Sequence, residues 1–155
     1  MIRLIGDGGH ASVVREIVKL TFMDRPSSGM FVAVGDNQAR KKEAENSQGP
    51  FATLIHPSAI ISESATIGKG SVVMAGAIIQ AHASIGKHVI VNTGATIDHH
   101  CIVEDYAHIA PGAHLCGAVI IGEGTLVGVG VGISPGTTIS PWSLVKAARL
   151  DVQPV

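Results

Sequence analysis

Histidine is the residue whose number and spacing in this sequence could support chemistry. The chain has eight histidines in 155 residues, and six of them lie within one stretch: His82, His88, His99, His100, His108 and His114. An imidazole titrates near neutral pH, so it can take a proton from one reacting group and return it to another. Asp98 stands immediately before His99 and His100, and Glu104 and Asp105 follow them. This stretch is the candidate acid–base or binding site of the chain.

A six-residue repeat predicts the elements that position these histidines. One branched apolar residue, always Ile, Val or Leu, fills each of sixteen positions spaced by six from Ile55 to Val145. Two places before each, from Ala59 to Ser143, stands a compact residue. A period of six fits neither an α-helix nor an alternating strand, and is typical of a hexapeptide β-helix. Three hexapeptides close one coil, so sixteen make about five coils with the branched residues inside, and His82 should stack on His100.

The first fifty residues predict a small α/β unit of their own, separate from a solenoid of residues 51–155. Its expected elements alternate strand, helix, strand and helix at residues 1–5, 11–20, 31–34 and 38–46. The second helix is expected to be charged and exposed. Such a unit is too small to bury a good core alone, so it should lean on the first coils or on a neighbouring subunit. The turn Gly6-Asp7-Gly8-Gly9-His10 is either a cradle for an anion or nucleotide, or a simple tight connection.

The composition of the chain indicates which partners to expect and in which cell compartment the protein lies. The formal net charge is −1 and 15% of residues are charged, which gives no electrostatic reason to expect nucleic acid or membrane partners. No apolar run approaches 18 residues, and the first residues have no apolar signal-peptide region. Cys101 and Cys116 are expected to be small buried apolar side chains. The sequence therefore predicts a cytoplasmic protein.

Three segments of the chain resemble the NeuD/PglD-type sugar acyltransferases, a branch of the left-handed β-helix hexapeptide acetyltransferases. They are LIGDGGHASVVREIV at 4–18, VAVGDN at 32–37, and the run from ATLIHPSA at 52–59 through NTGATIDHHC at 92–101 and HIAPGA at 108–113. The resemblance implies a left-handed parallel β-helix preceded by a truncated Rossmann-like unit, because the family's further strand with an acidic pair is missing. It also implies a homotrimer with its active site between neighbouring solenoids, using acetyl-CoA and no metal. The acceptor would be an amino or hydroxyl group of a sugar or nucleotide-linked sugar.

The same resemblance assigns roles to individual residues. His99 matches the catalytic histidine, which takes a proton from the acceptor as it attacks the thioester. The family usually has an acidic residue directly after this base, where the present chain has His100; His100 and Asp98 are therefore the candidates for orienting it. The resemblance places acetyl-CoA against His108, Val129 and Ala147. It places the sugar substrate against Asp7, Gly8, Gly9 and His10.

Two other functions remain open at this point. One is a zinc enzyme of the γ-carbonic-anhydrase type, in which His82 and His100 would combine with His108 or His88 across a subunit interface. The opening Gly-Gly-His-Ala argues against this function, because those enzymes lack the first domain. The other is a non-catalytic trimeric scaffold. Metal content would separate the zinc enzyme from a transferase, and binding of CoA would separate the scaffold from it.

Overall fold

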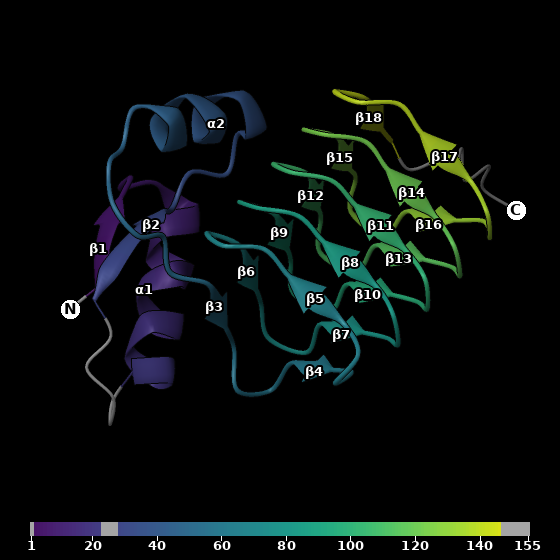
Figure 1. Cartoon of the computed structure of the whole chain (residues 1–155), viewed down its shortest axis with the longest axis horizontal. Helices are drawn as coiled ribbons and strands as arrows, with labels where there is room; N and C mark the ends of the chain where they lie inside the picture. Colours follow the sequence, from purple (N-terminus) through teal and green to yellow (C-terminus); the bar gives the residue numbers. More distant parts are fainter. Residues whose placement is uncertain (1, 23–27, 147–155) are drawn as a thin grey trace, which may run out of the picture.

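The computed structural model describes residues 2–22 and 28–146, which form a small α/β unit at one end of a stack of coils (Figure 1). The α/β unit consists of β1 (Ile2–Ile5), α1 (Gly9–Phe22), β2 (Gly29–Val32) and α2 (Asn37–Glu45). The two strands pair in parallel with Ile2 opposite Gly29, so β2 begins two residues earlier than predicted. The Asp36 side chain accepts a hydrogen bond from the backbone N–H of Ala39 at 2.8 Å, which caps the start of α2.

Sixteen short strands follow, and the second residue of each is one of the sixteen predicted branched residues. Each strand pairs in parallel with the strand eighteen residues further on, so three sheets form the three sides of the coils. The β3 sheet contains β3 (Leu54–Ile55), β6 (Val72–Val73), β9 (Ile90–Val91), β12 (His108–Ile109), β15 (Leu126–Val127) and β18 (Leu144–Val145). The β4 sheet contains β4 (Ile60–Ile61), β7 (Ile78–Ile79), β10 (Thr96–Ile97), β13 (His114–Leu115) and β16 (Gly132–Ile133). The β5 sheet contains β5 (Thr66–Ile67), β8 (Ser84–Ile85), β11 (Ile102–Val103), β14 (Ile120–Ile121) and β17 (Thr138–Ile139).

The core of the coils is the predicted stack of branched and compact side chains. From Val73 to Ile133 its apolar members are at most 7% exposed, whereas those of the end coils, such as Ile61 and Ile139, are only partly buried. Two compact positions carry hydroxyls with no solvent exposure, Ser71 and Thr125. Each hydroxyl donates to a backbone carbonyl of the neighbouring coil, at 2.8 and 2.9 Å, which offsets the cost of burying it. The predicted β-helix and its inward register are confirmed.

The α/β unit completes its own core with the outer face of the β3 sheet. Leu54, Val72 and Ile90 point outward from three successive coils and are nevertheless 0–1% exposed. They pack in one cluster with Val14 of α1 and Phe31 of β2. The expectation that the small unit leans on the first coils is confirmed, and the apolar area shared here is what holds α1 in place.

Helix α2 crosses the corner between the β5 and β3 sheets and is attached there by polar side chains. Arg40, 1% exposed, donates from Nε to the carbonyl of His88 at 2.8 Å and from Nη2 to the carbonyl of Tyr106 at 2.7 Å. Asn37, 8% exposed, donates from Nδ2 to the carbonyl of Gly124 at 3.0 Å. The prediction that this helix is exposed is therefore wrong for one face. Only one of its three buried residues is apolar, so an analysis of apolar spacing does not find that face.

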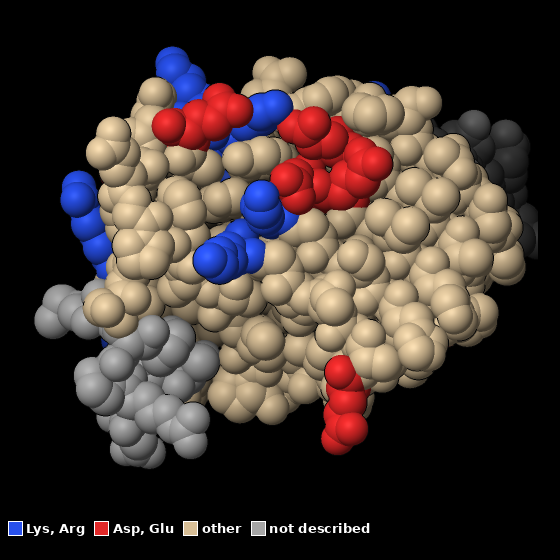
Figure 2. All heavy atoms as spheres, viewed as in Figure 1, with Lys and Arg blue, Asp and Glu red and all other residues tan. Residues whose placement is uncertain are grey.

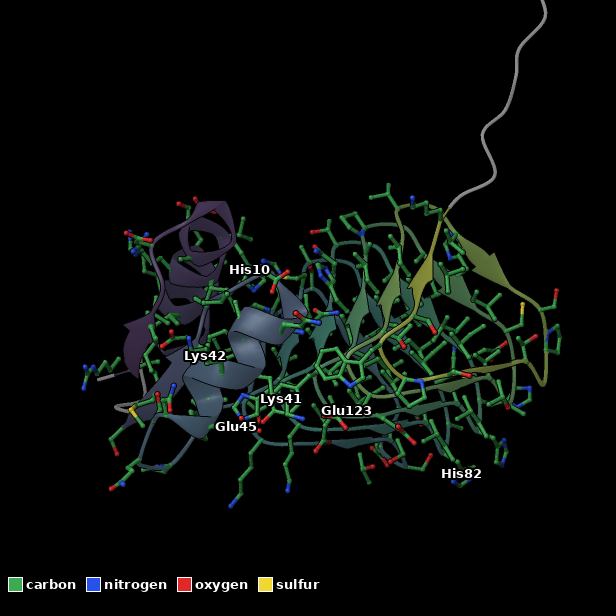
Figure 3. The ribbon with its side chains drawn as sticks, turned by 90° about the horizontal axis from the view of Figure 1, so that it is seen from above. His10, Lys41, Lys42, Glu45, His82 and Glu123 are labelled. Atoms are coloured by element: carbon green, nitrogen blue, oxygen red, sulfur yellow. The ribbon has the colours of Figure 1, made fainter. Side chains whose placement is uncertain are left out.

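An ion pair at the surface adds to this attachment. Lys41 Nζ lies 2.7 Å from Glu123 Oε1 and within 5.6 Å of the ring centroids of both Tyr106 and Trp142. Figure 2 shows acidic side chains gathered where α2 meets the coils, and Figure 3 shows Lys41 and Glu123 side by side. Solvent screens an ion pair at the surface, so the buried hydrogen bonds of Arg40 are the stronger attachment. Neither helix of the described chain is long and apolar enough to cross a membrane.

Candidate active site

His99 lies at the corner that follows β10, between the β4 and β5 sheets. Its backbone is held on both sides, because its N–H donates to Asp98 Oδ1 at 2.7 Å and its carbonyl accepts from the N–H of Ala118 at 2.9 Å. The side chain is exposed. The fold therefore fixes the backbone of His99 and leaves its imidazole accessible to a reactant.

The ring of His99 contacts the ring of His100. Their Nδ1 atoms are 3.1 Å apart and the rings meet edge to face, with centroids 5.3 Å apart. A hydrogen bond between two Nδ1 atoms requires a proton on only one of them. When His99 donates, its Nε2 carries a free lone pair, which is the form that a general base needs. Of the two candidates for orienting this ring, His100 contacts it directly and Asp98 contacts the backbone N–H.

His82 lies at the same corner as His100, one coil earlier in the stack. The rings of His82 and His100 lie 5.0 Å apart, which confirms the predicted stacking of residues eighteen apart. Both residues have left-handed backbone angles, with φ of 60° and 58°, at turn positions where other coils have glycine. Within residues 2–22 and 28–146, no group of three or more His, Cys, Asp or Glu side chains is arranged to hold a metal ion.

A groove of about 230 Å³ runs along the outer face of the β4 sheet beside this corner. Its lining includes Asp98, Gln80, Cys116 and the hydrogen-bonded pair formed by Thr96 and His114, whose Oγ1 and Nδ1 atoms are 2.8 Å apart. Cys116 is exposed, so the prediction that it is buried is wrong: it follows inward-facing Leu115 and points to the opposite side. The groove therefore supplies a mainly apolar surface with several polar side chains next to the corner that carries His99.

His10 and His108 form a second site, where the α/β unit meets the β3 sheet. His108 faces outward from β12, with Nε2 3.0 Å from Nδ2 of Asn92, and its ring also hydrogen-bonds to the backbone of Gly35. Nε2 of His10 is buried without a hydrogen-bond partner among the described residues. Burial first, and the charge of Arg40 second, lowers the pKa of each of these two histidines to about 4. Both imidazoles are therefore neutral at pH 7.

The remaining predicted residues of the glycine-rich turn lie at the start of α1, which begins at Gly9. Asp7, Gly8 and Gly9 are exposed, and the space beside both glycines is open. Asp7 lines a pocket of about 470 Å³ with Glu43, at the carboxyl ends of β1 and β2. Ligands bind at that edge in many parallel sheets, so the pocket is a candidate site for the acceptor.

Two predicted acetyl-CoA contacts lie far along the chain from this turn. Val129 follows β15 and is 67% exposed, so it is free to contact a ligand or another chain. Ala147 lies outside the described residues. The predictions for both residues stay predictions.

Several residues of the histidine-rich stretch have structural roles. His88 is 5% exposed, stacks on Tyr106 at 5.2 Å and meets the edge of Phe51 at 4.6 Å. Burial, ahead of the charge of Arg40, lowers its pKa. Carboxylate oxygens of Glu104 and Asp105 accept hydrogen bonds from backbone N–H groups one coil away, at 2.8 and 2.7 Å. Sequence reasoning missed Arg40, because two of the three buried positions of its helix, at 37, 40 and 44, carry polar side chains and leave no apolar spacing to detect.

The two histidine sites lie on opposite sides of the coils. A corner between the β4 and β5 sheets is opposite the β3 sheet, which carries His108. At about 3.3 Å per residue, a side of about five residues spans roughly 16 Å. Figure 3 shows His10 at the junction with the α/β unit and His82, which stacks on His100, on the far side of the solenoid. His99 and the pair of His10 and His108 therefore do not face a common space within one chain.

The neutral pair predicts acid-sensitive stability. The folded pKa values near 4 are below the ordinary value of 6.5, so the unfolded chain binds more protons between pH 6.5 and 4. We expect the melting temperature to fall as the pH decreases from 6.5 to 5, where carboxylates titrate little. His108→Gln removes one of the two groups and should flatten this decline. Equal pH slopes for the variant and the wild type, measured by thermal denaturation, would contradict the burial of a neutral His108.

Solved structures of acetyltransferases share this architecture. No family model matches the chain. It superposes with a TM-score of 0.87 on the acetyltransferase domain of PglB from Neisseria gonorrhoeae in complex with acetyl coenzyme A, at 35% identity, covering 92% of this chain and 86% of that one. A mutant of perosamine N-acetyltransferase from Caulobacter crescentus, in complex with CoA and GDP-perosamine, gives a TM-score of 0.85 at 32% identity, covering 92% and 84%.

A curated relative agrees with these structures over a shorter stretch. UDP-N-acetylbacillosamine N-acetyltransferase of Bacillus subtilis is 38% identical, over 41% of this chain and 46% of the relative. The present chain thus spans about half the length of this curated relative. On the identity and coverage of the solved structures, the chain belongs to the NeuD/PglD-type sugar acetyltransferases, which fold as left-handed parallel β-helices.

Proposed function

We propose that this chain transfers the acetyl group of acetyl-CoA to an amino or hydroxyl group of a sugar, with His99 as the general base. The observation that carries the proposal is the exposed imidazole of His99, whose Nδ1 is 3.1 Å from Nδ1 of His100, beside an open groove. Two of the relatives named above are N-acetyltransferases: one is named for a UDP-linked sugar and the other was solved in complex with GDP-perosamine. Both support an amino group on a nucleotide-linked sugar as the acceptor.

In the proposed reaction, His99 moves one proton. The acceptor nitrogen or oxygen attacks the thioester carbonyl carbon, and Nε2 of His99 takes the proton that the acceptor loses. The new bond to the acetyl carbon forms, the carbon–sulfur bond breaks, and Nε2 returns the proton to the thiolate of CoA. In the tautomer that this step needs, Nδ1–H of His99 donates to Nδ1 of His100, and this contact keeps the ring in one orientation while Nε2 holds the proton. A backbone N–H would stabilise the tetrahedral oxyanion.

We further propose a homotrimer that brings the two histidine sites together across each interface. Because His99 and the pair of His10 and His108 are on opposite sides of one chain, a neighbouring copy is needed to complete the site. Two outward side chains of the coils support such contacts: Ile60 on the β4 sheet is 63% exposed and Ile102 on the β5 sheet is 44% exposed.

Ligand contacts follow from this arrangement. Acetyl-CoA would lie in the groove between copies, against His108, Val129 and Ala147. The sugar would contact the loop of Asp7, Gly8, Gly9 and His10, next to the pocket that Asp7 and Glu43 line. The cosubstrate is a cytoplasmic metabolite, and we extend the proposal to that compartment.

Titration calorimetry tests this function first. We expect acetyl-CoA and CoA to bind the purified protein with micromolar affinity and one site per chain, on a sample whose mass is three times that of the chain. Release of the CoA thiol with a panel of amino sugars would then identify the acceptor. A folded trimer that binds neither acetyl-CoA nor CoA would contradict the proposal and favour a non-catalytic scaffold.

A further inference from the structure

Gly117 lies directly beneath the imidazole of His99, one coil further along the stack. A methyl group built on Gly117 would lie 2.5 Å from Cε1 of His99, 2.7 Å from Nε2 and 3.2 Å from Nδ1. Non-bonded carbon atoms are normally 3.5–4.0 Å apart, so the ring occupies the space that any side chain at this position would need. The imidazole therefore lies against Gly117 of the next coil, with Cε1 and Nε2 nearest to it.

The backbone itself gives no reason for a glycine at this position. The left-handed φ values that favour glycine occur at other positions, among them Gly112 and Gly124, and Gly117 is not one of them. At Gly68 and Gly122 the closest atoms belong to the backbone or to a proline of the neighbouring coil, whereas at Gly117 all three belong to the ring of His99. An alanine at 117 needs no left-handed φ, and the three atoms closest to its methyl group would all belong to the imidazole.

We propose that Gly117 is a positioning residue for His99, and that the missing side chain sets the orientation of the ring. The proposal rests on the proposed role of His99 as general base. Two contacts then define the ring: the bond between the Nδ1 atoms of His99 and His100 fixes one edge, and the backbone of Gly117 supports one face. Nε2 of His99 has no hydrogen-bond partner among the described residues, so its lone pair is available to the acceptor.

The cost of losing this support follows from the geometry of proton transfer. To restore a normal contact with a methyl group at 117, the ring must move by about 1 Å. A general base must lie within about 2.6–3.2 Å of the proton donor, and a displacement of about 1 Å can lower a rate about 100-fold. Because His99 is exposed, the ring can swing away without disturbing the core. Activity should fall while the stability of the coils remains.

The test compares Gly117→Ala with Gly132→Ala. Gly132 is the first residue of β16, in the coil that follows Gly117. It has no left-handed φ and nothing within 4 Å of a built methyl group, which makes it a control for the Gly→Ala change itself. We expect Gly117→Ala to lower kcat about 10- to 100-fold with the KM for acetyl-CoA and the melting temperature unchanged. Gly132→Ala should match the wild type. Wild-type kcat in Gly117→Ala would overturn the proposal.

Two further measurements separate positioning from other effects. In a His99→Ala background, Gly117→Ala should cause no further loss, and an additional loss of similar size would show that Gly117 acts elsewhere and overturn the proposal. NMR of histidine-labelled protein should show a nuclear Overhauser effect between Hε1 of His99 and the α-protons of Gly117, and its absence in the wild type would also overturn it. This contact is measurable even without turnover. If His99→Ala keeps full activity while the Overhauser effect is present, the proposed base is wrong and the packing of its ring is right.

Discussion

Replacing His99 with alanine should lower acetyl transfer by about three orders of magnitude without unfolding the protein. General acid–base catalysis contributes about 10²- to 10⁴-fold to a rate, and no other imidazole at this corner has the same position: the ring of His100 is committed to His99, and His82 lies beyond His100. The His99 side chain is exposed and contributes little to packing, so the melting temperature should change by only a degree or two. Release of the CoA thiol under saturating acetyl-CoA measures the effect.

His56→Ala provides the matched control for that variant. His56 belongs to the first coil, and its Nδ1 contacts Ser58 Oγ at 2.8 Å on the surface. Its removal deletes an imidazole of the same size without touching either histidine site, so turnover should stay within about twofold of the wild type. Turnover by His99→Ala at a similar level would remove His99 from the mechanism, whereas unchanged CoA binding by the inactive variant would show that the loss lies in the chemical step.

The six-residue repeat predicted the strands of the coils and their inward-facing residues, because each hexapeptide carries its own inward branched residue. A branched residue every sixth position has one way to face the interior, and stacking at eighteen residues follows from three sides per coil. The same rule predicts that His82 stacks on His100, and their ring centroids lie 5.0 Å apart in the structure.

Contacts between the α/β unit and the coils were not predictable in the same way. The period of the repeat says which coil residues point outward, but it does not say which of them a separate unit covers. The junction of His10, Gly35 and His108 is one example, because its members are far apart in the sequence and join only when α1 docks. Arg40 is another example, because a charged residue in a helix made mostly of polar residues normally faces water. Resemblance to a family assigned roles to His10 and His108 but did not show that they face each other.

Arg40→Met should be among the most destabilising single substitutions at this junction. The guanidinium donates to the carbonyls of Val34 and Gly35 within the α/β unit, both at 3.0 Å, and to the carbonyls of His88 and Tyr106 on two coils. The described residues place no carboxylate within ion-pair distance of it. Methionine fills similar space but leaves these buried carbonyls without a donor, each at a cost of about 1–3 kcal/mol. We expect a loss of about 3 kcal/mol or more, and a melting temperature lower by roughly 10 °C.

Lys42→Met is the control for Arg40→Met, because Lys42 lies on the same helix and is exposed. It should leave the melting temperature unchanged within about a degree. Hydrogen exchange locates the damage: amides of α2 and of the β1–β2 pair should lose protection in Arg40→Met, while those of the coil core around Ile97 keep it. Equal loss of protection throughout would mean that the α/β unit and the coils unfold as one cooperative body, and would contradict a local role for this arginine.

The same substitution should also change the second histidine site. The charge of Arg40 is the second cause, after burial, of the low pKa of His10 and of His108. Arg40→Met removes that charge and loosens the docking that buries both rings, and each change acts in the same direction, so both pKa values should rise toward 6.5. Histidine NMR titration measures this rise directly. If both values stay near 4 although the guanidinium is gone, burial by α1 alone keeps the pair neutral, and Arg40 attaches the helix without setting the charge of the site.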